Sequence, residues 1–387
     1  MCRSKLFRIK TLILVSTLLS PLMAAPALAG DTLEIKIPVQ VYADVGAFKR
    51  YAGAATSSDS TAAATPGSDG AFVGTLTLFS APRIGDQTLG LFEVVSEFNG
   101  AGRAVFAVER AQIGYAYNDA LTVWGGRFHT PYGYWNTAYH HGAQLQPSIA
   151  RPVQLSGSLP AHNVGVWATG MFNMPVGKLT YDLYVGNSTR VVSGAIDPNH
   201  PAGDNQSKNF GGNLGYNAGG VLDGLRIGVH MLQGKVTACK EVAPTGSCTT
   251  TPVFGKSDLK MQGAYAYYEN HNVELIAEYY HFNNTNLISA PNPGYEAKSS
   301  SGFVQLGYVL ADDWIPFIRH EGTDYDQKDE YFRNLSHGKS YGKNTLGVRY
   351  ELNANAVLKA ELSKTKSLTA PSLAQTKEMR VQYAIRF

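Results

Sequence analysis

The chain has 387 residues, of which 33 are Lys or Arg and 30 are Asp or Glu, so its formal net charge is +3. Charged residues make up only 16%, well below the roughly 25% of an average soluble domain, while 44% of the residues are hydrophobic. This composition excludes a disordered tail, and three cysteines without zinc-site spacing exclude a disulfide-rich scaffold. Beyond residue 30 no run of 18 apolar residues occurs, which excludes a bundle of membrane-spanning helices.

The first 29 residues have the three parts of a secretory signal peptide. An apolar stretch over 11–25 follows a basic start, and 27–29 (Ala-Leu-Ala) is a small-x-small cleavage pattern. We expect cleavage after Ala29 and a mature chain of 30–387; a retained membrane anchor is the alternative, which two prolines in the segment disfavour. The leader carries four basic residues and no acid, so the formal charge of +3 becomes −1 without it. The slight basicity therefore gives no support for nucleic acid as a partner.

Alternation of apolar and polar residues dominates the rest of the chain and predicts strands with one apolar and one polar face. We place sixteen strands at 33–48, 71–80, 87–98, 104–117, 121–128, 162–172, 178–187, 208–217, 224–234, 257–269, 272–283, 300–310, 313–323, 340–351, 355–366 and 376–387. The two faces cannot be assigned cleanly around 104–110 and 314–321. An even number of strands of about ten residues, joined by alternately short and long connections, is typical of an all-β transmembrane antiparallel barrel.

Charge is costly on a lipid-facing surface, so the polar strand faces predict a wet lumen, which a ring of about sixteen strands leaves open. The residues expected to line it are Lys343, Arg349, Glu351, Lys359, Glu361, Arg380 and Arg386. Tyrosines near the strand ends predict aromatic girdles at the membrane boundaries. A secreted soluble β-sandwich or solenoid is the alternative, but a sandwich of this length usually splits into domains, and the low-complexity stretch 52–71 follows only one strand.

The connection 129–161 has an unusual composition, because no Asp or Glu occurs between 120 and 181, where the average composition would place about five. The residues we expect at a constriction formed there are Arg127, His129, Tyr132, Tyr134, Trp135, Tyr139, His140, His141 and Arg151. Three interpretations stay open. One is a composition bias towards Gly, Pro and aromatic residues, the second is a constriction that does not repel anions, and the third is a set of aromatic side chains that stack on sugar faces.

Two further clusters carry candidate chemistry. His140 and His141 are adjacent, so one metal ion could bind both only at a turn, with His129 or His162 completing the site and no carboxylate nearby in the sequence. We therefore expect ordinary polar loop histidines, with no metal and no cofactor. In a long connection near residue 240, Cys239 and Cys248 predict an intraloop disulfide worth about 2.7 kcal/mol by loop-closure arithmetic; two reduced thiols are the alternative.

The end of the chain carries a resemblance to a known family. The final Val-Gln-Tyr-Ala-Ile-Arg-Phe resembles the C-terminal assembly signal of Gram-negative outer-membrane proteins, with Tyr383, Ile385 and Phe387 as its alternating apolar residues. With the leader and the strand number, the mature chain resembles a Gram-negative outer-membrane porin of the trimeric type. The segment 126–133 (Gly-Arg-Phe-His-Thr-Pro-Tyr-Gly) is similar to a Gly-basic-x-x-x-Pro-aromatic-Gly segment of porins related to the phosphate-selective group. The residues after it contain no Lys, and we expect no phosphate selectivity.

The resemblance implies a bacterial outer-membrane location, a homotrimer, and three kinds of partner: outer-membrane lipid, small hydrophilic solutes and the barrel-assembly machinery. In porins of this type the long connection after the fifth strand, here 129–161, folds into the barrel and narrows it. The function implied is passive diffusion of small hydrophilic solutes, with tolerance for anions or a preference for neutral solutes.

Alternative functions are a receptor or export channel, an adhesin barrel and, less favoured, a hydrolase with its site at the rim. The sequence has no Gly-x-Ser-x-Gly elbow and no HExxH helix. The acid and histidine cluster that could serve a rim enzyme consists of His320, Glu321, Asp324 and Asp326.

Overall fold

The computed structural model describes residues 34–51, 69–98, 103–192, 195–201, 207–238, 254–287, 292–311, 313–336, 339–369 and 375–387. The chain divides into two units, Met1–Glu34 and Ile35–Phe387, and all strands of the described ranges belong to the second. The predicted signal peptide lies outside these ranges, as do Cys239 and Cys248.

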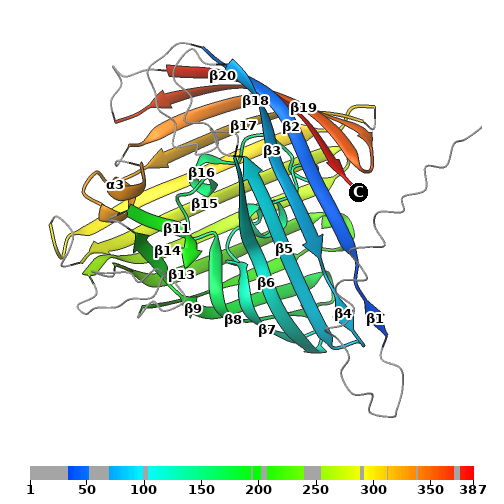
Figure 1. The fold of residues 1–387 in the computed structure, drawn as a ribbon, viewed down its shortest axis with the longest axis horizontal. Coiled ribbons are helices and arrows are strands. Elements are labelled where there is room, and N and C mark those ends of the chain that lie inside the picture. Colours follow the sequence, from blue (N-terminus) through cyan, green and yellow to red (C-terminus); the bar gives the residue numbers. More distant parts are fainter. Residues whose placement is uncertain are drawn as a thin grey trace, which may run out of the picture. The chain divides into compact units, whose positions relative to one another are not determined.

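Sixteen long strands in the described ranges form one ring. They are β2 (Val39–Tyr51), β3 (Asp69–Ser80), β5 (Thr88–Phe98), β6 (Ala104–Asn118), β7 (Leu121–His129), β8 (His162–Asn173), β9 (Lys178–Asn187), β12 (Lys208–Asn217), β13 (Leu225–Ala238), β14 (Phe254–Asn270), β15 (Val273–Asn286), β16 (Glu296–Tyr308), β17 (Trp314–Asp324), β18 (Tyr341–Asn353), β19 (Ala356–Ser367) and β20 (Gln375–Arg386). Each overlaps the strand predicted from the sequence, so the antiparallel sixteen-strand barrel is confirmed (Figure 1).

Smaller elements lie in the connections. The short strands are β1 (Ile35–Lys36), β4 (Arg83–Ile84), β10 (Thr189–Val192) and β11 (Ala195–Pro201), and the α-helices are α2 (Trp135–Ala138) and α3 (Glu330–Ser336). Single 3-10 turns occur at Val153–Leu155 and Gly220–Leu222. Among the described residues, no helix has the length and apolar character needed to cross a membrane.

The first and last long strands close the ring. In β2 and β20 the residues pair antiparallel over Tyr42–Tyr51, with Ala47 opposite Val381. The backbone of Val41 exchanges two further hydrogen bonds with that of the terminal residue Phe387, at 2.7 and 3.0 Å. Closure leaves neither strand with an unpaired edge, which is the condition for strands to lie in lipid.

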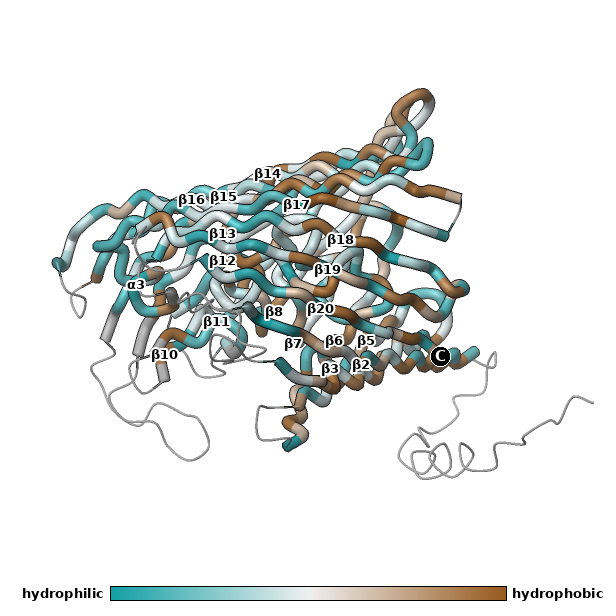
Figure 2. Tube along the Cα trace, turned by 90° about the horizontal axis from the view of Figure 1, so that it is seen from above, coloured by the Kyte–Doolittle hydropathy of each residue, from teal (hydrophilic) through white to brown (hydrophobic). Residues whose placement is uncertain are grey.

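The alternation in sequence becomes an apolar outside and a polar inside. Four cross-strand neighbours on β17 to β20 form one row whose side chains are 39–58% exposed. The row is Ile318, Leu346, Leu362 and Met379. One residue along, Arg319 and Thr345 are buried on the opposite face. Figure 2 shows hydrophobic stretches of the strands gathered in the part of the barrel away from α3.

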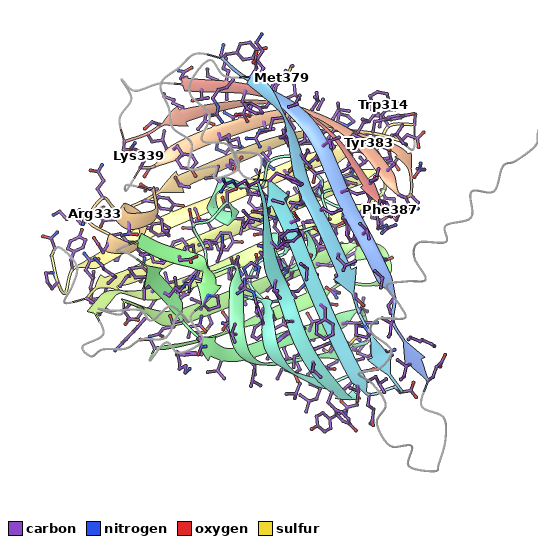
Figure 3. The ribbon with its side chains drawn as sticks, viewed as in Figure 1. Trp314, Arg333, Lys339, Met379, Tyr383 and Phe387 are labelled. Carbon is purple, nitrogen blue, oxygen red and sulfur yellow. The ribbon has the colours of Figure 1, made fainter. Side chains whose placement is uncertain are left out.

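The two ends of the barrel differ in the side chains they carry. Figure 3 shows Trp314, Tyr383 and Phe387 near one end and Arg333 and Lys339 near the other. The ring of Trp314 packs on that of Tyr350 from β18, with centroids 4.4 Å apart. Aromatic side chains at a strand end are the expected anchors at a membrane boundary.

Candidate constriction and the residues that hold it

The connection between β7 and β8, residues 130–161, is held by glutamates of β15, β17 and β19. Glu278 of β15 accepts the backbone N–H groups of Tyr134 (2.8 Å) and Trp135 (2.6 Å). Because β17 stands opposite β7 in the sixteen-strand order, a connection bonded to β17 crosses the interior of the ring.

The other two glutamates bind further along the same connection. Glu321 of β17 accepts the N–H of Val153 at 2.6 Å, and Glu361 of β19 accepts those of Ile149 (2.5 Å) and Ala150 (3.2 Å). Hydrogen bonds to an ionised acceptor are roughly twice as strong as neutral ones, so these carboxylates hold the connection firmly.

Two cations of the wall bind carbonyl groups of the same connection. The guanidinium of Arg319 is fully buried, and its Nη1 donates to Ser148 Oγ at 2.7 Å and to the carbonyl of Ala150 at 2.9 Å. Its Nε lies 3.2 Å from Glu321 Oε1, so the charge is paired. Lys359 donates to the carbonyl of Ala143. The barrel wall therefore supplies carboxylates that accept from backbone N–H groups of the connection and cations that donate to its backbone carbonyl groups.

Aromatic residues of the connection pack in the apolar interior instead of facing a passage. Tyr132 and Trp135 are 1% and 0% exposed and belong to a cluster with Tyr280, Phe303 and Phe332. Neither is placed to stack on a sugar, contrary to one of the three interpretations of the sequence. Their burial explains the aromatic composition of this stretch as packing.

Tyr134 and Tyr139 are only partly buried. The ring of Tyr134 stacks on Tyr267 with centroids 4.2 Å apart, and the guanidinium of Arg226 lies 5.8 Å from its centre. Burial raises the pKa of the Tyr139 hydroxyl above its ordinary value. These two rings are the aromatic groups of the connection that remain partly accessible.

The two arginines expected at the constriction bind backbone carbonyls. Arg127 donates from Nε to the carbonyl of Glu109 (3.1 Å) and from Nη2 to that of Asn199 (3.0 Å). Arg151 donates to the carbonyl of His140. Arg151 therefore holds the backbone of the connection, whereas Arg127 joins β7 to the backbones of β6 and β11.

The histidines expected to be ordinary polar loop residues are buried together, which corrects that expectation. His129, His140, His141 and His162 gather around Glu109 of β6, with one ligand-type atom of each of the five residues within 4.8 Å of every other. The carboxylate missing from their sequence neighbourhood comes from a strand twenty residues earlier in the chain than the first of them. Because the histidines are buried, they do not form the surface of a passage.

The expected lining residues fall into three groups. Lys343, Lys359 and Glu361 are buried, and the latter two bind the connection described above. Arg349 and Arg380 are partly buried in ion pairs, with Glu274 at 2.6 Å and with Glu378.

The third group lies at the turns. Glu351 is exposed, and Arg386 donates to the carbonyl of Ala354 in the turn between β18 and β19. These two residues therefore belong to one rim of the barrel.

Two ion pairs that the sequence pattern did not indicate lie on the barrel wall, one between β5 and β6 and the other between β2 and β20. Glu93 of β5 accepts from Arg110 of β6 at 2.7 Å, and Glu378 of β20 accepts from Arg50 of β2 at 2.6 Å. Arg110 is the more accessible member of its pair, with 21% of its side chain exposed against 2% for Glu93.

A β-bulge explains why the alternation of apolar and polar residues in β6 did not predict the charged residues there. Glu93 pairs with Arg110 and Val94 with Val108, so Glu109 is an extra residue in β6. A bulge lets consecutive side chains share a face, which breaks the alternation at 104–110. In β17 the alternation does hold, and His320 and Glu321 point to opposite faces, so no rim cluster of those two residues forms.

Comparisons with known proteins agree with this architecture. No protein-family model matches the sequence, and no curated protein matches it significantly. Among solved structures, the anion-selective porin from Comamonas acidovorans superposes with a TM-score of 0.58 at 13% identity, over 92% of this chain and all (100%) of the porin. The outer-membrane channel DcaP of Acinetobacter baumannii gives 0.58 at 10% identity (91% and 97% of the two chains), and Salmonella typhi OmpF in complex with daunomycin gives 0.58 at 13% (91% and 98%). The chain has the fold of a Gram-negative outer-membrane porin.

Proposed function

We propose that the chain is an outer-membrane porin, a water-filled channel through which small hydrophilic solutes diffuse passively. The observation that carries the proposal is a closed ring with an apolar outside and a charged inside, crossed by a connection bonded to the far wall. An apolar outside suits lipid, and a charged inside suits water. The porins and channels with the same fold support it.

The proposed selectivity is tolerance for anions or a preference for neutral solutes. Glu278, Glu321 and Glu361 are buried and bonded to the connection, so their charges are shielded from a permeating ion. Arg110 is the more exposed partner in its pair with Glu93. Accessible cationic groups bias a pore towards anions, and the Comamonas porin is described as anion-selective.

The proposal extends to assembly and export. The signal peptide is removed after Ala29, the barrel-assembly machinery reads the segment ending in Phe387, and three copies form a trimer. A related fold, the outer-membrane protein OmpT of Vibrio cholerae (TM-score 0.53, 12% identity), is described in a trimer form.

Single-channel recording on refolded protein tests the function. A porin produces stepwise conductance in a planar bilayer, and a salt gradient gives a reversal potential of the sign expected for anion or weak selectivity. Firm cation selectivity would refute the proposed selectivity. A folded protein that conducts nothing would refute the porin itself and favour an adhesin, a gated receptor or export channel, or a rim enzyme.

A further inference from the structure

The group around Glu109 is built from two sources. Glu109, His129 and His162 belong to β6, β7 and β8, which are neighbours in the wall, and His129 lies directly opposite His162 in the strand pairing. His140 and His141 come from the crossing connection. The ring of His140 lies 4.3 Å from that of His129 and 4.8 Å from that of His162, between centroids.

Several polar atoms in this group are buried with no hydrogen-bond partner among the described residues. They are Glu109 Oε2, His129 Nε2, His141 Nε2 and both ring nitrogens of His162. His162 Nε2 nevertheless lies only 2.5 Å from Glu109 Oε2, and His141 Nε2 lies 3.1 Å from it. One ligand-type atom from each of the five side chains thus lies within 4.8 Å of the others, and neither His129 Nε2 nor His162 Nδ1 has a hydrogen-bond partner among the described residues. Leaving such atoms buried and unpaired is costly, so a native partner is expected.

The surroundings prepare His140 to act as a ligand. Asn136 donates from Nδ2 to the carbonyls of Thr130 and Ala161, which orients its Oδ1 to accept a hydrogen bond from His140 Nδ1 at 2.8 Å. The proton is thereby held on Nδ1, and the lone pair of Nε2 faces Glu109 Oε2 at 4.0 Å. Hydrogen bonding of the second ring nitrogen is the usual support of a metal-bound histidine.

His141 is placed differently. Arg151 Nη2 lies 3.4 Å from its Nδ1. A guanidinium can only donate, so Nδ1 accepts and the proton of a neutral ring sits on Nε2, towards Glu109. His141 therefore directs its Nε2–H towards the carboxylate of Glu109, 3.1 Å away, and is not counted among the metal ligands.

We propose that Glu109, His129, His140 and His162 form a binding site for a divalent transition-metal ion of the Zn²⁺ type. Three imidazoles and one carboxylate are a donor set that suits zinc, copper, nickel or iron. Tetrahedral zinc with bonds of about 2.0 Å spaces its ligand atoms about 3.3 Å apart, and the distances from Glu109 Oε2 to His162 Nε2 (2.5 Å) and to His140 Nε2 (4.0 Å) bracket that value.

The site joins the connection to the wall from which it leaves. His140 is the ligand from the connection, and the other three ligands are fixed in paired strands. A bound ion would clip residues 136–141 to β6, β7 and β8, while the wall glutamates hold the connection at its far side. The inference does not depend on conduction, because a folded barrel that conducts nothing would still contain these ligands.

The test uses refolded, untagged full-length mature protein stripped with a chelator. We expect one equivalent of Zn²⁺ per chain by calorimetry and elemental analysis, and Cu²⁺ electron paramagnetic resonance with hyperfine splitting from several nitrogens. The variants Glu109→Gln and His162→Ala should each weaken Zn²⁺ binding at least about tenfold. The matched control is His320→Ala, an exposed histidine of β17, which should bind as the parent does.

Two results overturn the proposal. One is a folded parent protein that retains no Zn²⁺ and shows no nitrogen coupling of Cu²⁺. The other is unchanged affinity in Glu109→Gln or His162→Ala. The parent measurement decides the question even where a variant fails to fold, and folding is checked by the heat-dependent shift in electrophoretic mobility. Hydrogen exchange adds a readout of position, because Zn²⁺ should slow exchange around His140 in the parent and leave it unchanged in Glu109→Gln.

Discussion

Glu278 Oε1 lies 2.6 Å from the backbone nitrogen of Trp135 and accepts its N–H together with that of Tyr134. The wall thus supplies the negative charge that the connection itself lacks. An Asp or Glu in the connection would compete with the wall glutamates for the same N–H groups and repel them at short distance. This contact disfavours an acidic residue near Tyr134 and Trp135, which lie within the acid-free stretch between 120 and 181.

Glu278→Gln should loosen the connection. Glutamine keeps one acceptor but loses the charge that strengthens both hydrogen bonds, and the expected loss in the free energy of unfolding is about 1.5–3 kcal/mol. Denaturant titration of refolded protein measures the loss, and single-channel records should show larger or noisier conductance. Glu296→Gln, at the exposed start of β16, is the control. Equal stability and equal conductance in the two variants would contradict the anchoring role.

Arg319→Met should destabilise the barrel strongly. It removes donors to Ser148 and Ala150 and the closer of the two cations beside the buried Glu321, so that only Lys343 remains, at 3.7 Å, and the change should cost about 3 kcal/mol. Arg333→Met breaks the pair between the half-exposed Arg333 and the buried Glu330, which keeps Lys256 as a partner at 3.8 Å, and should cost at most about 1 kcal/mol. Thermal unfolding compares the two variants. The double variant Arg319→Met with Glu321→Gln should recover part of the loss, and full additivity of the two changes would argue against coupling.

Arg110→Gln should shift ion selectivity towards cations. The substitution removes an accessible cation and leaves the carboxylate of Glu93 uncompensated. Reversal potentials in a salt gradient should give an anion-to-cation permeability ratio lower than that of the parent. Arg333→Gln, at the end of the barrel that carries α3, serves as the comparison. An unchanged ratio in Arg110→Gln would place the passage away from β6.

The stability of the α3 region should depend on the protonation of Asp329. Burial raises the pKa of Asp329 to about 6 from its ordinary 3.8, although its carboxylate accepts from Asn284 (2.9 Å), Ser299 (3.1 Å) and Tyr331 N–H (3.0 Å). The folded state binds the proton more tightly than the unfolded chain, so this group's contribution to stability falls as pH rises from about 4 to about 6, by at most about 3 kcal/mol.

Denaturant titrations at pH 4.5 and pH 7 check this dependence. Asp329→Asn should flatten the slope of stability against pH over that range, whatever its effect on absolute stability. Asp324→Asn, at the exposed end of β17, should leave the slope as it is. A parent protein whose stability rises between pH 4 and 6 by the same amount as Asp329→Asn would contradict the raised pKa.

Cys239 and Cys248 should form a disulfide in the connection between β13 and β14. Intact-mass measurement of the exported protein should give a mass lower by the two lost hydrogens, restored by reductant. Export places the chain in an oxidising compartment, which favours the bond. Alkylation of both thiols without prior reduction would show that they are free.

The strand pattern was predictable because each strand meets two different solvents. Lipid on one side and polar contents on the other favour apolar and polar side chains at alternate residues. In β18, Leu346 lies on the apolar outer face and Lys343 on the polar inner face, and their residue types show this in the sequence. The short strands β4, β10 and β11 were not predicted, since two to seven residues carry too few alternations to be recognised, and β1 lies within the predicted strand 33–48.

The interior contacts were much less predictable, for two physical reasons. A single bulge residue, Glu109, broke the phase of β6 and hid the acid that faces the histidines. Contacts such as Arg319 with Ala150 join residues 169 positions apart, and the sequence carries no local signal of which wall residue faces which part of the connection. The residues of the connection could be named in advance, but their partners could not.

The pairing of β2 with β20 has a consequence for biogenesis. Val41, in β2, is bonded to Phe387, which follows β20, so the last seam of the cylinder can form only after β20 has been translated and exported. A chain shortened by its final dozen residues would leave the edges of both β2 and β19 open in lipid. Quality control for this molecule can therefore be a single check for β20, because a polypeptide that lacks this strand cannot close the ring.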